Sequence, residues 1–263
     1  GIFINWSILL SILTFSLSLL GTFLVRSGIL VSVHAFANDP ERGLYILLFL
    51  TIIIGSSLTL YFLKSKSLIF YKEYAISSKE FLLLLNNLFL TITTFAILIG
   101  TLYPLVTSSL NLGKISVGAP YFNFIFAALT LPIVFLMSPA IFSSWSKSNY
   151  KSLIKKLGFI LFYSIIITYI FLNIYYESDI FIVCLAIALA IFTILSSLLR
   201  IYQVSNISNG KRIMQKILSI PSSYLSNLLS HIGIGVLIIG ITVSNYYSIH
   251  KEIVMTKNSE ITI

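Results

Sequence analysis

The chain alternates between long apolar stretches and short polar ones. Seven of the apolar stretches have the length of about 18 to 25 residues that an α-helix needs to cross about 30 Å of hydrocarbon. They lie at about 3–25, 44–63, 81–103, 122–143, 157–175, 180–199 and 226–245. The pattern predicts an all-α, polytopic integral membrane bundle of about seven transmembrane helices, in one domain that covers residues 1–245.

The charged residues divide between the two sides of this bundle. Loops 64–80, 144–156 and 200–225 carry 12 of the 17 basic residues, so the positive-inside rule places these loops on the cytoplasmic or matrix side. The other loops then lie on the exported side, together with six of the eight acidic residues. That mixture of signs is not a polyanion-binding surface, so we expect membrane lipid and no nucleic acid as a partner.

Composition narrows the class further. With 57% hydrophobic and 10% charged residues and a mean hydropathy of +1.00, the chain has too little polar surface for a soluble globule. Cys184 is its only cysteine and lies within an apolar stretch, which excludes a disulfide framework, a CxxC redox pair or a thiolate metal cluster within this chain. We therefore expect partners to supply any thiol or electron chemistry.

The exported stretch 24–43 carries the most chemistry. On a helix its apolar residues would form one stripe with His34 on its shoulder, as in a short helix that lies in the membrane interface. Asn38-Asp39-Pro40 is a stop signal for that helix. His34 has no neighbours in zinc spacing, whereas an imidazole held at the membrane surface suits an axial position of an iron porphyrin. The alternative is an interfacial, hydrogen-bonded histidine without a ligand.

Two further histidines are available to complete such a site. His231 lies inside the last apolar stretch, where a titratable group is costly and therefore indicates a function. The alternative is a neutral histidine that bonds to a neighbouring helix. His250 lies in the polar tail, and we expect it to be solvated. The second exported loop, 104–121, contains two prolines and two glycines, which predict a defined turn rather than a flexible tether.

Three segments resemble the signature blocks of one known family. They are GTFLVRSGILVSVHAFANDPERG around His34, GTLYPLVTSSLNLGKISVGAPYFN across the loop 104–121, and SHIGIGVLIIGI around His231. All three are similar to blocks of the CcmF-type haem lyases of cytochrome c maturation. The resemblance spans nearly the whole chain and identifies it as the C-terminal half of such a protein.

The resemblance implies a role in c-type cytochrome biogenesis. A haem lyase of this kind receives b-type haem from a haem chaperone at the outer membrane face and supports its covalent attachment to the CxxCH motif of apocytochrome c. His34 and His231 are then expected to be axial ligands of the iron of the haem in transit. The expected location is a bacterial inner membrane with the haem site facing the periplasm, or a mitochondrial inner membrane. Thiol-reducing or apocytochrome-handling subunits are further expected partners, and neither zinc nor a nucleotide is an expected cofactor.

The remaining haem contacts follow from the chemistry of the porphyrin. Its two propionates would attract cations, and the candidates on the exported side are Arg26, Arg42 and Lys114. For each of these, the alternative is a snorkelling interface anchor. Phe36 and Tyr121 are candidates for packing on the porphyrin. The sequence has no Ser-His-Asp, Cys-His or paired-carboxylate arrangement, so we expect the protein to contribute placement of the haem rather than a catalytic acid or base.

Two parts of the family pattern are absent from the sequence. These are the tryptophan-rich haem-binding loop and the intramembrane histidines that are expected to hold a second, permanent haem. The chain begins at Gly1 beside a span, and residues 246–263 resemble the start of a truncated extracytoplasmic segment. We therefore expect lyase activity only in a larger complex with the missing N-terminal half, on the same chain or on a separate polypeptide.

The rival interpretation is a non-enzymatic membrane transporter or a structural subunit of a respiratory complex. In either case His34 would be merely interfacial. A transporter should show ionisable groups that face a mid-membrane path, and apart from His231 the predicted spans contain essentially none.

Overall fold

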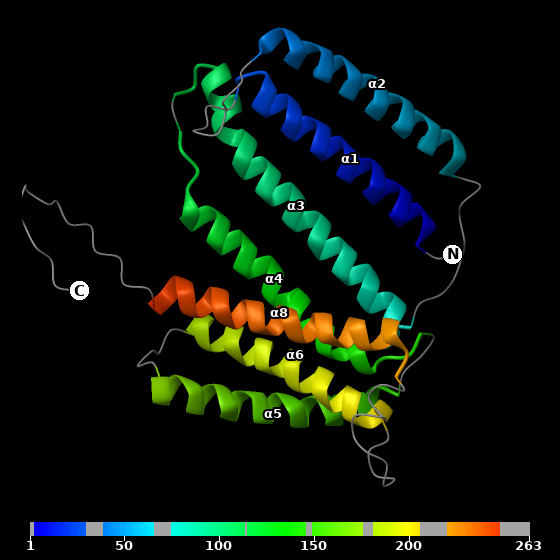
Figure 1. Ribbon diagram of the computed structural model, residues 1–263, viewed down its shortest axis with the longest axis vertical. Coiled ribbons are helices and arrows are strands. Elements are labelled where there is room, and N and C mark those ends of the chain that lie inside the picture. The colour runs from blue at the N-terminus through cyan, green and yellow to red at the C-terminus, as the bar shows by residue number, and fades with distance from the viewer. Residues whose placement is uncertain are drawn as a thin grey trace, which may run out of the picture. The chain divides into compact units, whose positions relative to one another are not determined.

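A computed structural model describes residues 3–29, 39–65, 75–113, 115–145, 149–175, 181–205 and 220–247. The described residues form the helices α1 (Ile4–Arg26), α2 (Pro40–Lys64), α3 (Lys79–Ser109), α4 (Ala119–Phe142), α5 (Tyr150–Tyr175), α6 (Phe181–Ser205) and α8 (Ser222–Tyr247) (Figure 1). All seven are long enough and apolar enough to cross a membrane. The predicted all-α membrane bundle is confirmed, and the chain is an integral membrane protein.

Several helices extend past their predicted ends. Helix α2 begins at Pro40 rather than near residue 44, because proline is favoured at the first helical position, where its missing N–H has no partner to lose. Helix α3 continues through Pro104 to Ser109, so the prediction that the second exported loop starts at residue 104 was wrong. A proline is tolerated inside a transmembrane helix because neighbouring groups and local backbone adjustments satisfy the freed carbonyl.

The chain forms two compact units. The first consists of residues 1–73 and 98–119, and the second of residues 74–97 and 120–263. In the first unit α1 and α2 pack against each other. Large apolar side chains of α2 remain exposed, including Leu44 at 67% and Phe62 at 77%. Such exposure is expected of a helix surface that faces lipid rather than water.

Helix α6 forms the centre of the second unit. It lies between α5 and α8 (Figure 1). The buried core joins α4, α5 and α6 through Val134, Ile160, Leu189 and Phe192. Small residues allow close packing of helices in membranes, and Gly235 of α8 shows this directly. A Cβ built on Gly235 would lie 2.6 Å from Cγ1 of Ile194 and 3.0 Å from the carbonyl oxygen of Ala190, both in α6.

One end of the second unit is basic. At the start of α3, the backbone N–H of Lys79 donates to the carbonyl of Ser144, just after α4 (2.9 Å). Near the end of α6, Nε of Arg200 donates to the hydroxyl of Tyr224 in the first turn of α8 (2.7 Å). The first two turns of α5 add Lys151, Lys155 and Lys156. We call this region the basic end, and it carries part of the charge that the sequence assigns to the cytoplasmic side.

Candidate functional site

The base of the His34 loop lies in the first unit, where α1 ends and α2 begins. The backbone N–H of Asp39 donates to the carbonyl of Arg26 (2.9 Å), which holds the two ends of the loop together. The Asp39 carboxylate in turn accepts a hydrogen bond from the backbone N–H of Arg42 (3.1 Å) and so caps α2. His34 and Phe36 lie outside the described residues.

Two of the predicted propionate contacts meet at this base. Nε of Arg42 lies 3.1 Å from Oδ2 of Asp39, and Nη2 of Arg26 lies 3.8 Å from the same oxygen. The Arg42 side chain is 72% exposed, so its ion pair contributes little to stability. A guanidinium carries five N–H donors, more than one carboxylate contact uses. The geometry is therefore compatible with a second carboxylate beside Asp39.

A glycine is required at the same place. Gly43 is buried in α2, and a Cβ built on it would lie 2.9 Å from both Cα and Cβ of Ser27. Real Cβ atoms essentially never approach other heavy atoms so closely. The first turn of α2 thus packs against the end of α1 only because residue 43 has no side chain.

The second predicted loop begins with a tight turn after α3. The N–H of Leu112 donates to the carbonyl of Thr107 (3.0 Å), and Asn111 and Gly113 adopt φ values of 55° and 107°. Such positive φ angles favour glycine and asparagine, which agrees with the predicted defined turn. Residues 98–119 belong to the same unit as the base of the His34 loop. Lys114 lies outside the described residues.

Tyr121 belongs to the second unit and has a role in packing. Its hydroxyl donates to the carbonyl of Ala96 in α3 (2.8 Å), and its ring meets Phe122 edge-on with 5.3 Å between ring centroids. These contacts join the start of α4 to α3. A contact between Tyr121 and a porphyrin stays a prediction.

His231 lies deep in α8. It follows Ser222, the first residue of the helix, by nine positions and precedes Tyr247, the last, by sixteen. At 1.5 Å per residue it is roughly 13 Å from the first end and roughly 24 Å from the second. Its Nδ1 atom is buried and has no hydrogen-bond partner. A buried polar atom without a partner is costly unless a ligand satisfies it.

The side chains near His231 come from the basic end. Tyr224 precedes His231 by two turns on the same face of α8 and accepts the hydrogen bond from Arg200. Lys79 interacts electrostatically with both His231 and Arg200. The Lys79 ammonium also lies 5.3 Å from the centre of the Trp145 ring. Lys79, Arg200 and Tyr224 thus lie toward one end of the helix from the partly buried histidine.

Sequence reasoning treated Lys79 and Arg200 only as determinants of topology and overlooked Tyr224. The seven-residue spacing between Tyr224 and His231 was a usable signal, because it places both on one helix face. The partner of Tyr224 comes from another helix, and no local pattern indicates that pairing. Among the described residues, no group of three or more His, Cys, Asp or Glu side chains is arranged to hold a metal ion.

Together, the fold and these sites define an integral membrane protein that combines an arginine–aspartate cluster at the base of one loop with a partly buried histidine in its last described helix. No family model matches the chain, and no solved structure does.

Curated relatives match it over essentially its whole length. The cytochrome c-type biogenesis protein CcmF of Pseudomonas aeruginosa is 37% identical over 263 residues, which are 100% of this chain and 39% of the relative. CcmF of Escherichia coli is 37% identical over 98% of this chain and 38% of its own length. The cytochrome c-type biogenesis protein CycK of Rhizobium meliloti is 37% identical over 90% of this chain and 35% of its own length.

Over its whole length the chain is homologous to one part of the CcmF cytochrome c-type biogenesis proteins. It spans about two fifths of the length of the relatives that it matches. All three relatives are named for cytochrome c-type biogenesis, and none is named as a transporter or as a structural subunit of a respiratory complex.

Proposed function

We propose that the chain forms part of a cytochrome c haem lyase and that His34 binds the haem that is being transferred. The site would lie at the periplasmic face of a bacterial inner membrane, or at the corresponding face of a mitochondrial inner membrane. The observation that carries the proposal is the base of the His34 loop, where Arg26 and Arg42 converge on Asp39. It supplies two cations at the base of the loop that carries His34, a histidine within one of the segments that resemble the family.

The contribution of this chain would be placement of the substrate. The haem supplies two vinyl groups, to which the two thiols of the apocytochrome CxxCH motif add. The His34 imidazole would donate a lone pair to the iron and so fix the distance of the porphyrin from the loop. The guanidiniums of Arg26 and Arg42 would pair with the propionates and fix the rotation of the ring in its plane. The vinyl edge would then be held in reach of the thiols, which is catalysis by proximity.

His231 is a candidate ligand of a separate haem. If His34 lies in an exported loop, a single iron could not bind both histidines, because His231 is roughly 24 Å from the exported end of α8. We therefore propose that His231 binds a haem inside the membrane, and its buried, unpartnered Nδ1 fits such a ligand. Lys79 and Arg200 would neutralise the propionates of that haem. The second axial ligand of each haem would come from the part of the family's length that this chain does not span.

The partners of the complex follow from the same proposal. They are the missing N-terminal half, a haem chaperone that delivers the substrate, apocytochrome c that accepts it, and a subunit that keeps the apocytochrome thiols reduced. The reductant has to come from such a partner because Cys184 is the only cysteine of this chain.

Substitution of His34 tests the proposal. His34→Ala should abolish cytochrome c maturation at normal membrane abundance, because an interfacial imidazole adds little to helix packing. Added free imidazole should partly restore haem binding, since it occupies the position of the lost ligand. His250→Ala is the matched control and should mature cytochrome normally. Maturation at the normal level by the His34→Ala protein would contradict the proposal.

Substitution of His231 separates the two proposed haems. His231→Ala should remove the intramembrane haem, and with it a bis-histidine absorption spectrum, from the complex purified in the absence of substrate haem. His34→Ala should leave that spectrum intact. If both variants lost the same pigment, the two histidines would belong to one site and the separation would be wrong.

A further inference from the structure

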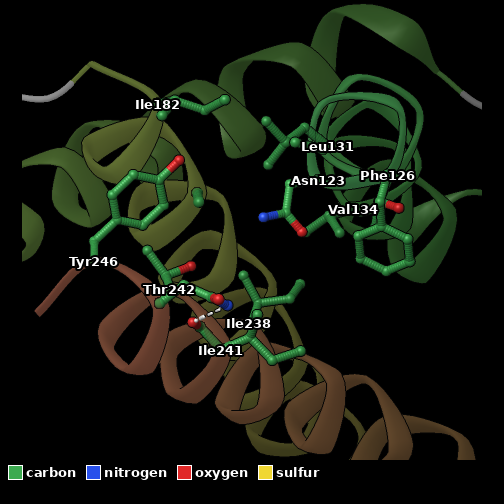
Figure 2. Close-up of a pocket in the computed structure, with 13 residues that line it drawn as sticks. Asn123, Phe126, Leu131, Val134, Ile182, Ile238, Ile241, Thr242 and Tyr246 are labelled. Atoms are coloured by element: carbon green, nitrogen blue, oxygen red, sulfur yellow. Dashed lines mark hydrogen bonds between the residues drawn. The ribbon is translucent and has the colours of Figure 1, made fainter. Parts of the chain in front are cut away.

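A cavity of about 300 Å³ lies in the second unit, between α4, α6 and α8 (Figure 2). Its deeper part is lined mainly by apolar residues, including Leu131, Val134 and Ile238, with Thr130 as a polar residue at the level of Leu131. Asn123 lies near the start of α4, and Asn245 and Tyr246 lie near the end of α8. These polar residues are therefore at the end of the unit that is opposite to the basic end. We call this polar part of the cavity its mouth.

The depth of the cavity matches one leaflet of a bilayer. Asn123 at the mouth and Val134 in the deeper part are both in α4 and are separated by eleven positions. At 1.5 Å per residue this is roughly 16 Å along the helix axis. One leaflet contributes about half of the roughly 30 Å of hydrocarbon in a membrane. A ligand that fills the cavity thus has an apolar part about as long as one leaflet is thick.

The polar residues at the mouth determine which polar group of a ligand can bind there. Among the residues that the structure describes, none that lines the cavity is charged, so these residues offer no partner to an ionic group. Figure 2 shows the Asn123 amide directed into the open space between the helices. The Asn245 amide donates one hydrogen bond to the carbonyl of Ile241 in its own helix (2.9 Å), and an amide nitrogen carries two donors. The mouth therefore offers uncharged donors, which suit a carbonyl acceptor.

We propose that this cavity binds one acyl chain of a phospholipid, with the ester carbonyl at the mouth and the charged headgroup outside it. A transmembrane helix of a partner is too large for the cavity, since a helix about 10 to 12 Å across would need far more than about 300 Å³ over the same length. An empty cavity would forfeit dispersion contacts along its apolar walls. The surrounding membrane supplies acyl chains at the right depth and in large excess.

Lipid retention tests the proposal. The chain, purified with its partners, is placed in nanodiscs of phosphatidylethanolamine and phosphatidylglycerol, transferred to detergent, washed, and analysed by quantitative mass spectrometry. The wild type should retain tightly bound phospholipid. Ala127→Leu, which fills the cavity, should lower retention at least tenfold. Ala128→Leu is the matched control, because Ala128 is the next residue of α4 but is exposed and does not line the cavity.

A second variant keeps the cavity volume unchanged. Asn123→Leu replaces the amide by an apolar group of similar shape and should lower retention about two- to tenfold, as expected for one lost hydrogen bond. If the Ala127→Leu protein fails to fold, the lipid retention of the Asn123→Leu protein still tests the proposal. The proposal is overturned if the wild type retains no lipid, if the Asn123→Leu protein retains as much as the wild type, or if a stoichiometric isoprenoid quinone is recovered instead.

Discussion

Replacement of Gly43 by alanine tests the close contact between α1 and α2 at the base of the His34 loop. The added Cβ would lie 2.9 Å from Cα of Ser27, a backbone atom that cannot turn aside as a side chain can. Overpacking of this kind typically costs about 1–3 kcal/mol. Alanine also stabilises a helix by about 1 kcal/mol relative to glycine. The measured change in the free energy of unfolding would therefore be smaller than the cost of the clash itself.

Gly55→Ala is the control that removes this ambiguity. Gly55 is also in α2, and a Cβ built on it meets nothing within 4 Å. It gains the same propensity without a clash, so the Gly43→Ala protein should be less stable than the Gly55→Ala protein by about 1–3 kcal/mol. Unfolding in mixed micelles by titration with a denaturing detergent, followed by circular dichroism, measures the difference. Equal midpoints for the two variants would refute the reasoning, because they would mean that α1 and α2 are not in contact there.

Three further predictions concern the second unit. Gly235→Ala should be about 1–3 kcal/mol less stable than Gly233→Ala in the same assay, since the added Cβ meets α6 at residue 235 and nothing within 4 Å at residue 233. Tyr224→Phe should lower stability by about 1 kcal/mol by removing the acceptor of the Arg200 hydrogen bond, and an unchanged midpoint would mean that water replaces it fully. Exchange of three lysines for glutamine should disturb topology, measured by a cysteine-accessibility assay, or lower the insertion yield, without altering haem ligation in the protein that inserts correctly; loss of bound haem at normal membrane abundance would contradict that. These lysines are Lys151, Lys155 and Lys156.

The sequence was sufficient to determine the number, type and approximate position of the membrane helices. In lipid every helix must satisfy its own backbone hydrogen bonds, so length and apolar composition alone identify a span. The family blocks around His34 and His231 were likewise readable, because they are contiguous in the chain. The helix ends were predicted less accurately, since a proline can either begin a helix or lie within one, as Pro40 and Pro104 do. A proline begins α2 but lies within α3, and only its neighbours decide between the two.

The tertiary structure decided which faces of these helices meet. Helix α4 is almost entirely apolar, and its few polar residues, such as Asn123 and Thr130, give only a weak signal of which side is buried and none of which helix covers it. The cavity beside Asn123, the contact of Gly235 with α6 and the bond between Arg200 and Tyr224 all depend on residues far apart in the chain. Arg26 and Arg42 were predicted individually, yet only the closed base of the loop joins both to Asp39. The hydrophobic pattern along the chain predicts where each helix lies. Which side chains then contact each other depends on the packing between helices.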